Sequence, residues 1–277
     1  MKPPKKDHSK RWVGVCMTPA LIDQFEVDQA VVVVIDVLRA TTSMATAFHN
    51  GVRSMIPVLT KEEGFALQKE GYLVAGERNG EQVEGFDFGN SPFSFTRDRV
   101  QGKDIVITTT NGTKALKAAV EHGAQEVLIG AFANQNALAT YLERENRNVV
   151  LLCAGWKDRP NLEDTIFAGA MVRRLRPQFN LYEDTALIAE TLYRNANRRK
   201  RYFLRNSSHF NRLYAKLRIQ KDVKYALRTD THPIVAKLYG DHLVAIDSPY
   251  EADFKKKPLS NIARPKPGKT KGPKAKV

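Results

Sequence analysis

Acidic and hydroxylic side chains with an arginine follow one apolar run near the start of the chain. Asp36 comes directly after residues 31–35, and Arg39, Thr41 and Thr42 come next. This set suits a phosphate group, because the N-terminus of a helix offers free N–H groups and a favourable dipole to which Arg39 adds a charged fork. The alternative is that Asp36 and Thr41 only cap the helix.

A second group of this kind lies 72 residues downstream without a gap. Ile35 corresponds to Ile107 and Thr41 to Thr113, which predicts an internal repeat of about 31–68 and 103–140. If strand–turn–helix units are repeated, both turns reach the same edge of the sheet and face one cleft. The second turn adds the candidate substrate-binding residues Thr109, Asn111, Gly112 and Thr113, and two further candidates are Asn90 and Lys157.

Further carboxylates follow other apolar runs. Glu77 comes after residues 72–75, and Glu163 and Asp164 open a helix that follows a strand at 148–153. Acids in a first helical turn also complement the helix dipole, so a purely structural role stays open. With Asp36, these carboxylates predict a site for Mg²⁺, a hard ion that takes oxygen ligands and bridges to phosphate. The histidines and cysteines show no zinc spacing.

The expected chemistry is transfer of a phosphoryl group to water, with Asp36 and Arg39 as the catalytic residues. Asp36 is either a metal ligand or base for an attacking water, or a covalent nucleophile. The Asp-x-Asp pattern of aspartyl-phosphate phosphatases is absent because Leu38 stands at the second position. We therefore favour water as the nucleophile.

The elements that position these residues form an α/β pattern. Residues 31–35 are five apolar residues, all of them β-branched, which is typical of a strand buried on both faces in a parallel sheet. Further strands are expected at 12–16, 103–107, 148–153 and 241–246, and a helical stretch at about 186–228. The pattern predicts a three-layer α/β/α fold with a parallel-rich sheet and duplicated strand–turn–helix units.

The positive charge is concentrated at the ends of the chain. Of the formal net charge of +14, residues 1–11 carry +4 and residues 255–277 carry +9, so residues 12–254 carry only +1. We predict a basic disordered arm (1–11), an α/β body (12–254) and a basic disordered tail (255–277). The tails support an alternative function, in which they bind nucleic acid and the body has no catalytic activity. Both functions can also coexist, with the tail weakly attracting RNA or a membrane to an active enzyme.

The two cysteines, Cys16 and Cys153, suit a reducing compartment and are expected to be structural. No stretch is long and apolar enough for a membrane span, and the start of the chain lacks a signal-peptide pattern. We therefore expect a cytoplasmic protein. The sequence leaves its oligomeric state open, a homo-oligomer included.

An ordered set of motifs resembles the 2-phosphosulfolactate phosphatase family. It consists of residues 36–42, Gly76-Glu77, residues 85–92, 109–113 and 153–155, and Glu163-Asp164, with Ser208-His209 and residues 222–226 in a helical C-terminal part. The resemblance runs from about Trp12 to Ile246. It implies a three-layer α/β fold and a Mg²⁺-dependent acid phosphatase that converts (2R)-2-phospho-3-sulfolactate into 3-sulfolactate and phosphate, a step toward coenzyme M.

Phosphate, sulfonate and carboxylate together demand several cations. The candidates are Arg39, Arg78, Lys114, Lys157 and Arg159. Another phosphorylated hydroxy acid would need much the same set, so a different substrate stays open. The basic tail and the Arg-rich segment 194–205 depart from the family pattern.

Overall fold

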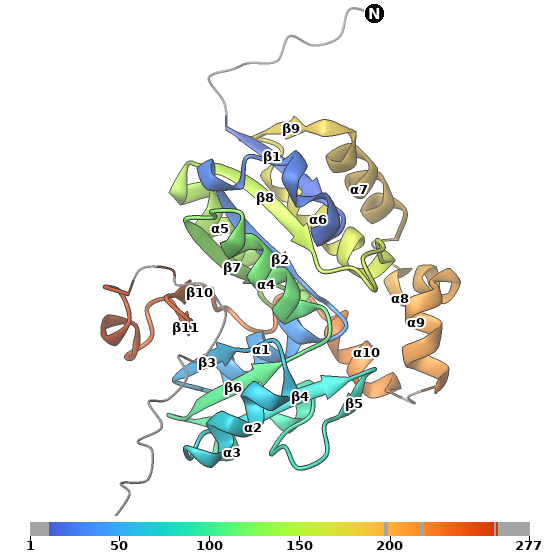
Figure 1. Cartoon of the computed structure of the whole chain (residues 1–277). Coiled ribbons are helices and arrows are strands. Elements are labelled where there is room, and N and C mark those ends of the chain that lie inside the picture. The colour runs from blue at the N-terminus through green and yellow to red at the C-terminus, as the bar shows by residue number, and fades with distance from the viewer. Residues whose placement is uncertain (1–10, 197–198, 217–218, 258, 260–277) are drawn as a thin grey trace, which may run out of the picture.

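A computed structural model describes residues 11–196, 199–216, 219–257 and 259, which fold around one sheet with helices on both faces (Figure 1). The strands are β1 (Trp12–Cys16), β2 (Ala30–Ile35), β3 (Ser54–Pro57), β4 (Leu73–Arg78), β5 (Glu81–Gln82), β6 (Asp104–Thr108), β7 (Glu126–Gly130), β8 (Asn148–Cys153), β9 (Asn180–Tyr182), β10 (Ala236–Tyr239) and β11 (His242–Ala245). The helices are α1 (Ala40–His49), α2 (Lys61–Lys69), α3 (Arg97–Val100), α4 (Gly112–Glu121), α5 (Gln135–Glu145), α6 (Leu162–Leu175), α7 (Glu183–Ala196), α8 (Lys200–Phe203), α9 (Ser208–Asn211) and α10 (Gln220–Ala226).

The sheet has the strand order β5-β4-β6-β3-β11-β10-β7-β2-β8-β1-β9. Parallel pairs form two groups, one around β2 and β8 and one around β3, β4 and β6. The antiparallel hairpin β10–β11 joins the groups, since Lys237 pairs with Leu128 of β7 and Leu243 pairs with Met55 of β3. The parallel-rich α/β fold is therefore confirmed, although the sequence indicated only the second strand of this central hairpin.

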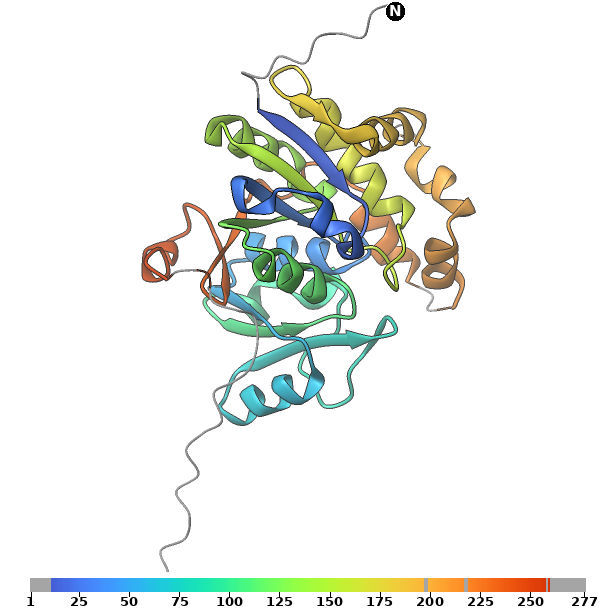
Figure 2. The ribbon, with the colours of Figure 1, turned by 45° about the horizontal axis from the view of Figure 1, so that its top comes forward.

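Strand β2 lies between β7 and β8, and its six residues are fully buried, as the run of β-branched residues predicts. Val32 and Val34 pack into the core that contains residues of α1 and α4. Val31, Val33 and Ile35 pack into the opposite core, under α5, α6 and α7. The period-two alternation thus places β2 in the middle of three layers, which Figure 2 shows from a second direction.

The two halves of the expected repeat have the same order of elements. Residues 31–68 contain β2, α1, β3 and most of α2, and residues 103–140 contain β6, α4, β7 and the first half of α5. Helix α1 is followed by Gly51 and α4 by Gly123, with φ of 87° and 86°, values in the left-handed region that favours glycine. Strands β2 and β6 are not neighbours in the sheet. The repeated strand–turn–helix units therefore do not place their first strands side by side.

Several expectations concern the ends of the molecule. Strand β1, expected at 12–16, lies between β8 and β9. Residues 1–10 and 260–277 lie outside the described residues, and with them most of the predicted arm and tail. Leu259, assigned by sequence to the tail, packs against the core, and the Lys255 ammonium pairs with Glu251. Within the described part of the chain, no helix combines the length and the apolar character that crossing a bilayer requires.

Candidate active site

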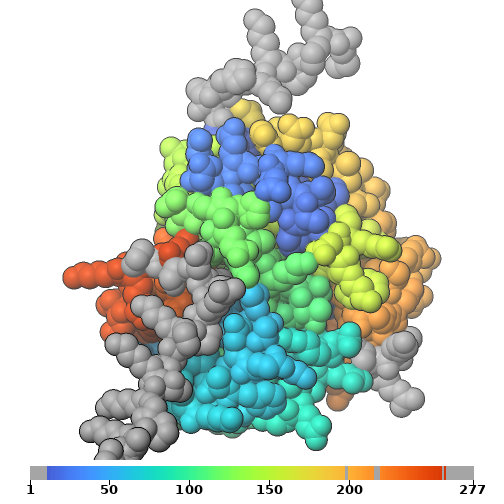
Figure 3. Space-filling model, viewed as in Figure 1, coloured from blue at the N-terminus to red at the C-terminus, as the bar shows by residue number. Residues whose placement is uncertain are grey.

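A polar cavity lies at the carboxyl ends of β2 and β6. Six separate stretches of the chain line it, and their residues are Asp36, Leu38, Arg39, Glu77, Asn79, Gly80, Asn90, Thr110, Asn111, Trp156, Lys157, His209, Arg212 and Leu213. On the surface, the loop after β8, the turn after β6 and the helical C-terminal part border one another on one face (Figure 3). The two repeated turns therefore face one cavity.

The two turns touch each other at Gly112, the first residue of α4. A Cβ atom at this position would lie 2.7 Å from the Cβ of Ala40 and 3.1 Å from Oδ2 of Asp36. Only a residue without a side chain allows this approach. Gly112 thus acts by bringing the turns together.

Replacing Gly112 by Ala is expected to force the turns apart and to lower kcat/KM by roughly 100-fold, the cost of about 1 Å of misplacement in a catalytic site. Steady-state kinetics would measure this effect. The matched control is Lys114→Ala in the same helix, whose ammonium pairs with Asp158 at the surface. Unchanged kinetics in Gly112→Ala would show that the close approach is not needed.

Asp36 lies at the centre of the first turn with little exposure to solvent. Its Oδ1 accepts a hydrogen bond from the Ala40 N–H at 3.2 Å, and its own N–H donates to Thr41 Oγ1 at 3.0 Å. Burial raises the pKa of Asp36 to about 6, and the charges of Glu77 and Glu163 add to this increase. Asp36 therefore binds the first N–H of α1 and is also a carboxyl group whose pKa is raised to about 6.

The guanidinium group of Arg39 is buried and held on two sides. Its Nη1 donates to Asp222 Oδ2 at 2.6 Å, and its Nη2 donates to the Gly80 carbonyl at 2.5 Å. Asp222 comes from α10 and also accepts a hydrogen bond from Ser91 Oγ at 3.1 Å. Arg39 thus joins the first turn to the β4–β5 hairpin and to the helical C-terminal part, with only part of its donor set left for a substrate.

Glu77 organises the second turn from the end of β4. Its Oε1 accepts from the Thr110 N–H at 2.7 Å, and its Oε2 accepts from the Gly80 N–H at 2.6 Å. The expected carboxylate at this strand end is therefore in the cavity lining. Its two oxygens also fix the backbone on either side of the cavity.

Four of the candidate substrate-binding hydroxyl groups lie behind the cavity, where they hold the turns. Thr41 Oγ1 donates to the Gly130 carbonyl at 2.7 Å, and Thr42 Oγ1 donates to the Val37 carbonyl at 2.9 Å. Thr109 Oγ1 accepts from the Thr113 N–H, and Thr113 Oγ1 donates to the Thr109 carbonyl. These contacts give the threonines a structural role, although Thr41 bonds the Gly130 carbonyl and does not cap α1 as the alternative expected. A role of these groups, and of Gly112, as direct substrate ligands stays an untested prediction.

Asp164 is fully buried and does not line the cavity. Its Oδ1 accepts from the Val37 N–H at 2.8 Å, and its Oδ2 accepts from Asn161 Nδ2 at 2.8 Å and from the Gly155 N–H at 3.2 Å. Each of its oxygens thus already holds backbone or a neighbouring side chain. Because Asp164 is absent from the cavity lining that contains Asp36 and Glu77, the structure favours a positioning role for it over the predicted role as a metal ligand.

Glu163 lies beside Asp164 and is also fully buried. Its Oε1 contacts Nδ1 of His209, whereas its Oε2 is buried without a hydrogen-bond partner. His209 lines the cavity, and its ring stacks on Trp156 with centroids 5.6 Å apart. Glu163 thus reaches the site through a histidine.

Sequence reasoning missed several residues of the cavity lining. His209, Arg212 and Trp156 reach it from segments whose patterns indicated only helix or loop. Arg212 Nη1 donates to the Asn79 carbonyl at 3.2 Å, its guanidinium carbon lies 5.0 Å from the Trp156 ring centroid, and its Nε is buried without a partner. The Ser208-His209 motif was the one sequence signal that pointed to this segment, and it did not indicate a role for His209.

Three of the candidate cations do not line the cavity. Arg78 donates to the carbonyls of Glu77 and Leu59, Lys114 pairs with Asp158, and Arg159 is exposed on the loop after β8. Arg39 and Lys157 remain, and Arg212 joins them. The cavity lining therefore contains three cationic side chains for an anionic substrate: Arg39, Lys157 and Arg212.

The donor set fits a hard divalent cation, although the four predicted ligands do not form one cluster. Within the described residues, no three Asp, Glu, His or Cys side chains are grouped closely enough to hold a metal ion. Mg²⁺ needs only one or two carboxylates, because waters and phosphate oxygens complete its shell. Asp36 and Glu77 line the cavity, and the buried oxygens Glu163 Oε2 and Asn90 Oδ1 lack hydrogen-bond partners. Asp36 and Glu77 are the residues that would hold the ion.

Comparison with known proteins shows the family of the chain. A family model described as 2-phosphosulpholactate phosphatase matches residues 16–241. A protein of Thermotoga petrophila described as a probable 2-phosphosulfolactate phosphatase is 38% identical over 217 residues, which cover 78% of this chain and 92% of the relative. A protein of Caldanaerobacter subterraneus subsp. tengcongensis with the same description is 37% identical over 212 residues, or 75% and 87% of the two chains. The chain therefore belongs to the 2-phosphosulpholactate phosphatase family, a family of phosphoric monoester hydrolases.

Proposed function

We propose that the protein is a Mg²⁺-dependent phosphatase that hydrolyses (2R)-2-phospho-3-sulfolactate to 3-sulfolactate and phosphate, a product on the route to coenzyme M. The observation that carries this proposal is the single cavity that joins Asp36 and Glu77 to Arg39, Lys157 and Arg212. The carboxylates suit a metal ion, and the cations suit a substrate with several negative charges. The family membership and the names of the relatives support this substrate.

In the proposed reaction, the oxygen of an attacking water forms a bond to phosphorus and the bond from phosphorus to the 2-oxygen of the substrate breaks. Asp36 takes the proton that the water loses, and the 2-oxygen takes up a proton as it leaves. Bound Mg²⁺ would supply charge neutralisation at the phosphate oxygens. Helices α1 and α4 both begin at the cavity, so their dipoles favour the negative phosphoryl group.

His209 is the residue best placed to face the leaving oxygen. Its Nδ1 contacts Glu163 Oε1, and its ring stacks on Trp156. These contacts leave Nε2 for the substrate. His209→Ala is expected to lower kcat by roughly 10²- to 10³-fold with a smaller change in KM, as for loss of a positioned acid–base group. The control is His122→Ala, whose ring pairs with Asp23. A kcat within about threefold of wild type would contradict this role for His209.

Phosphate release from synthetic 2-phospho-3-sulfolactate tests the proposed function, in parallel with 2-phospholactate and other phosphorylated hydroxy acids. We expect turnover that a chelator stops and that added Mg²⁺ restores, with the sulfonate substrate preferred. If only another compound were hydrolysed, the proposed mechanism would stand and that compound would be the substrate. Absence of turnover for every compound would contradict the proposal.

A further inference from the structure

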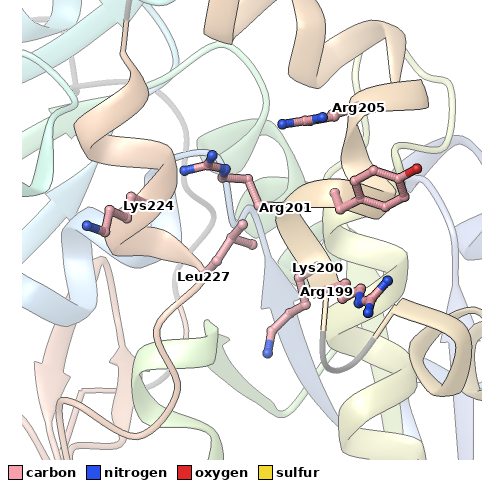
Figure 4. Close-up of a pocket in the computed structure, with 7 residues that line it drawn as sticks. Arg199, Lys200, Arg201, Arg205, Lys224 and Leu227 are labelled. Atoms are coloured by element: carbon pink, nitrogen blue, oxygen red, sulfur yellow. The ribbon is translucent and has the colours of Figure 1, made fainter.

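A second hollow lies outside the cavity, between the short helices α8 and α10. Its lining residues are Arg199, Lys200, Arg201, Tyr202, Arg205, Lys224 and Leu227, and its volume is about 400 Å³. Figure 4 shows Arg201 and Arg205 extending from one side and Leu227 facing them from the end of α10, whereas the ammonium group of Lys224 points away from them. None of these residues lines the cavity around Asp36, so the two sites are separate.

The hollow concentrates positive charge. Five of its seven lining residues are Arg or Lys, and none is Asp or Glu. Within the described part of the chain, no carboxylate lies within 4 Å of the charged groups of Arg199, Arg201, Arg205 or Lys224. Cations that repel one another around a concave surface favour an anion of several charges.

An aromatic ring stands among these cations. Tyr202 is 65% exposed, and the guanidinium carbon of Arg205 lies 5.4 Å from its ring centroid. Exposed tyrosine and arginine planes are surfaces on which nucleobases stack. Leu227 adds an apolar wall. The combination suits a ligand with a planar ring at one end and phosphates at the other.

The size of the hollow favours a small ligand over a polymer. Pockets for small molecules and cofactors measure about 300 to 1,000 Å³, and this hollow falls within that range. We propose that it binds a nucleoside triphosphate, with the phosphates on Arg201 and Arg205 and the base against Tyr202. The proposal concerns a site distinct from the phosphatase cavity and does not depend on the substrate hydrolysed there.

Isothermal titration of ATP into the full chain tests this proposal, in the Asp36→Asn background so that hydrolysis does not intervene. We expect saturable binding with one site, which Arg201→Glu/Arg205→Glu weakens at least tenfold. The matched control is Lys69→Glu/Arg97→Glu, which changes the net charge equally at two exposed positions and is expected to keep the affinity. Tyr202→Ala should weaken ATP severalfold and leave the affinity for tripolyphosphate unchanged.

Circular dichroism spectra of all variants would show that each one folds. Equal ATP affinity in Arg201→Glu/Arg205→Glu and wild type would overturn the proposal. Displacement of ATP by 2-phospho-3-sulfolactate would also overturn it, because the nucleotide would then occupy the catalytic cavity. Tight binding of a ten-nucleotide single-stranded RNA without saturable ATP binding would also overturn the proposal, because the hollow would then belong to an RNA-binding surface.

Discussion

Asp36→Asn is expected to abolish phosphate release and, at neutral pH, to make the protein more stable. The variant removes the group that accepts the proton from water, while the amide oxygen can still accept the hydrogen bond from the Ala40 N–H. Because burial and nearby carboxylates raise the pKa of Asp36 to about 6 from 3.8, ionising this group in the fold costs about 3 kcal/mol. A neutral amide does not carry this cost.

The sign of the pH dependence follows from the direction of that pKa shift. The contribution of Asp36 to the free energy of unfolding is fully present below pH 4 and is lost as the pH rises through about 6. Urea denaturation without metal, at pH 4.5 and 7.5, should show a larger advantage of Asp36→Asn at the higher pH. Asp104→Asn is the control, because Asp104 bonds Arg53 and Ser54 at the start of β6. Full activity in Asp36→Asn would contradict the assignment of Asp36.

Asp222→Ala is expected to destabilise the fold by about 3–5 kcal/mol, the typical cost of leaving one member of a buried ion pair without its partner. Arg39 and Asp222 have side-chain exposures of only 6% and 9%, and the change would leave the Arg39 guanidinium buried beside a cavity. The variant also loses the acceptor of the Ser91 hydroxyl. Because Arg39 lines the catalytic cavity, kcat/KM should fall as well.

A double-mutant cycle separates the ion pair from other effects of the substitution. The variant Arg39→Ala/Asp222→Ala should be less destabilised than the sum of the two single variants, because no buried charge remains unpaired. Urea denaturation measures all four free energies of unfolding. Additive effects in the cycle would mean that the pair does not stabilise the fold.

The sequence predicted the elements that depend on local patterns. Strand β2 shows as a run of β-branched residues, and the glycines after α1 and α4 mark both helix ends. The two turns were predicted to meet because carboxyl ends of parallel strands lie at one sheet edge, and Asp36, Arg39 and Asn111 do line one cavity. Helix α6 begins at Leu162, after Asn161 as its cap.

Features that depend on contacts between distant segments were not accessible in this way. The hairpin β10–β11 is inserted between two parallel groups through single pairs with β7 and β3. Strand β11 was expected at 241–246, but the four residues of β10 carry little pattern. His209 and Arg212 reach the cavity only because the helical C-terminal part folds over it. Thr41 and Thr113 have the residue type that binds phosphate, but their hydroxyl groups donate to the carbonyls of Gly130 and Thr109.

In the proposed mechanism, the two turns form one phosphate site. This arrangement can be tested by a crystal structure of Asp36→Asn with 2-phospho-3-sulfolactate. The predicted result places the phosphorus atom between residues 36–39 and 109–112, with Arg39 and Lys157 or Arg212 in contact with the anion. A phosphate group bound to only one of the two turns, or in the hollow between α8 and α10, would contradict it.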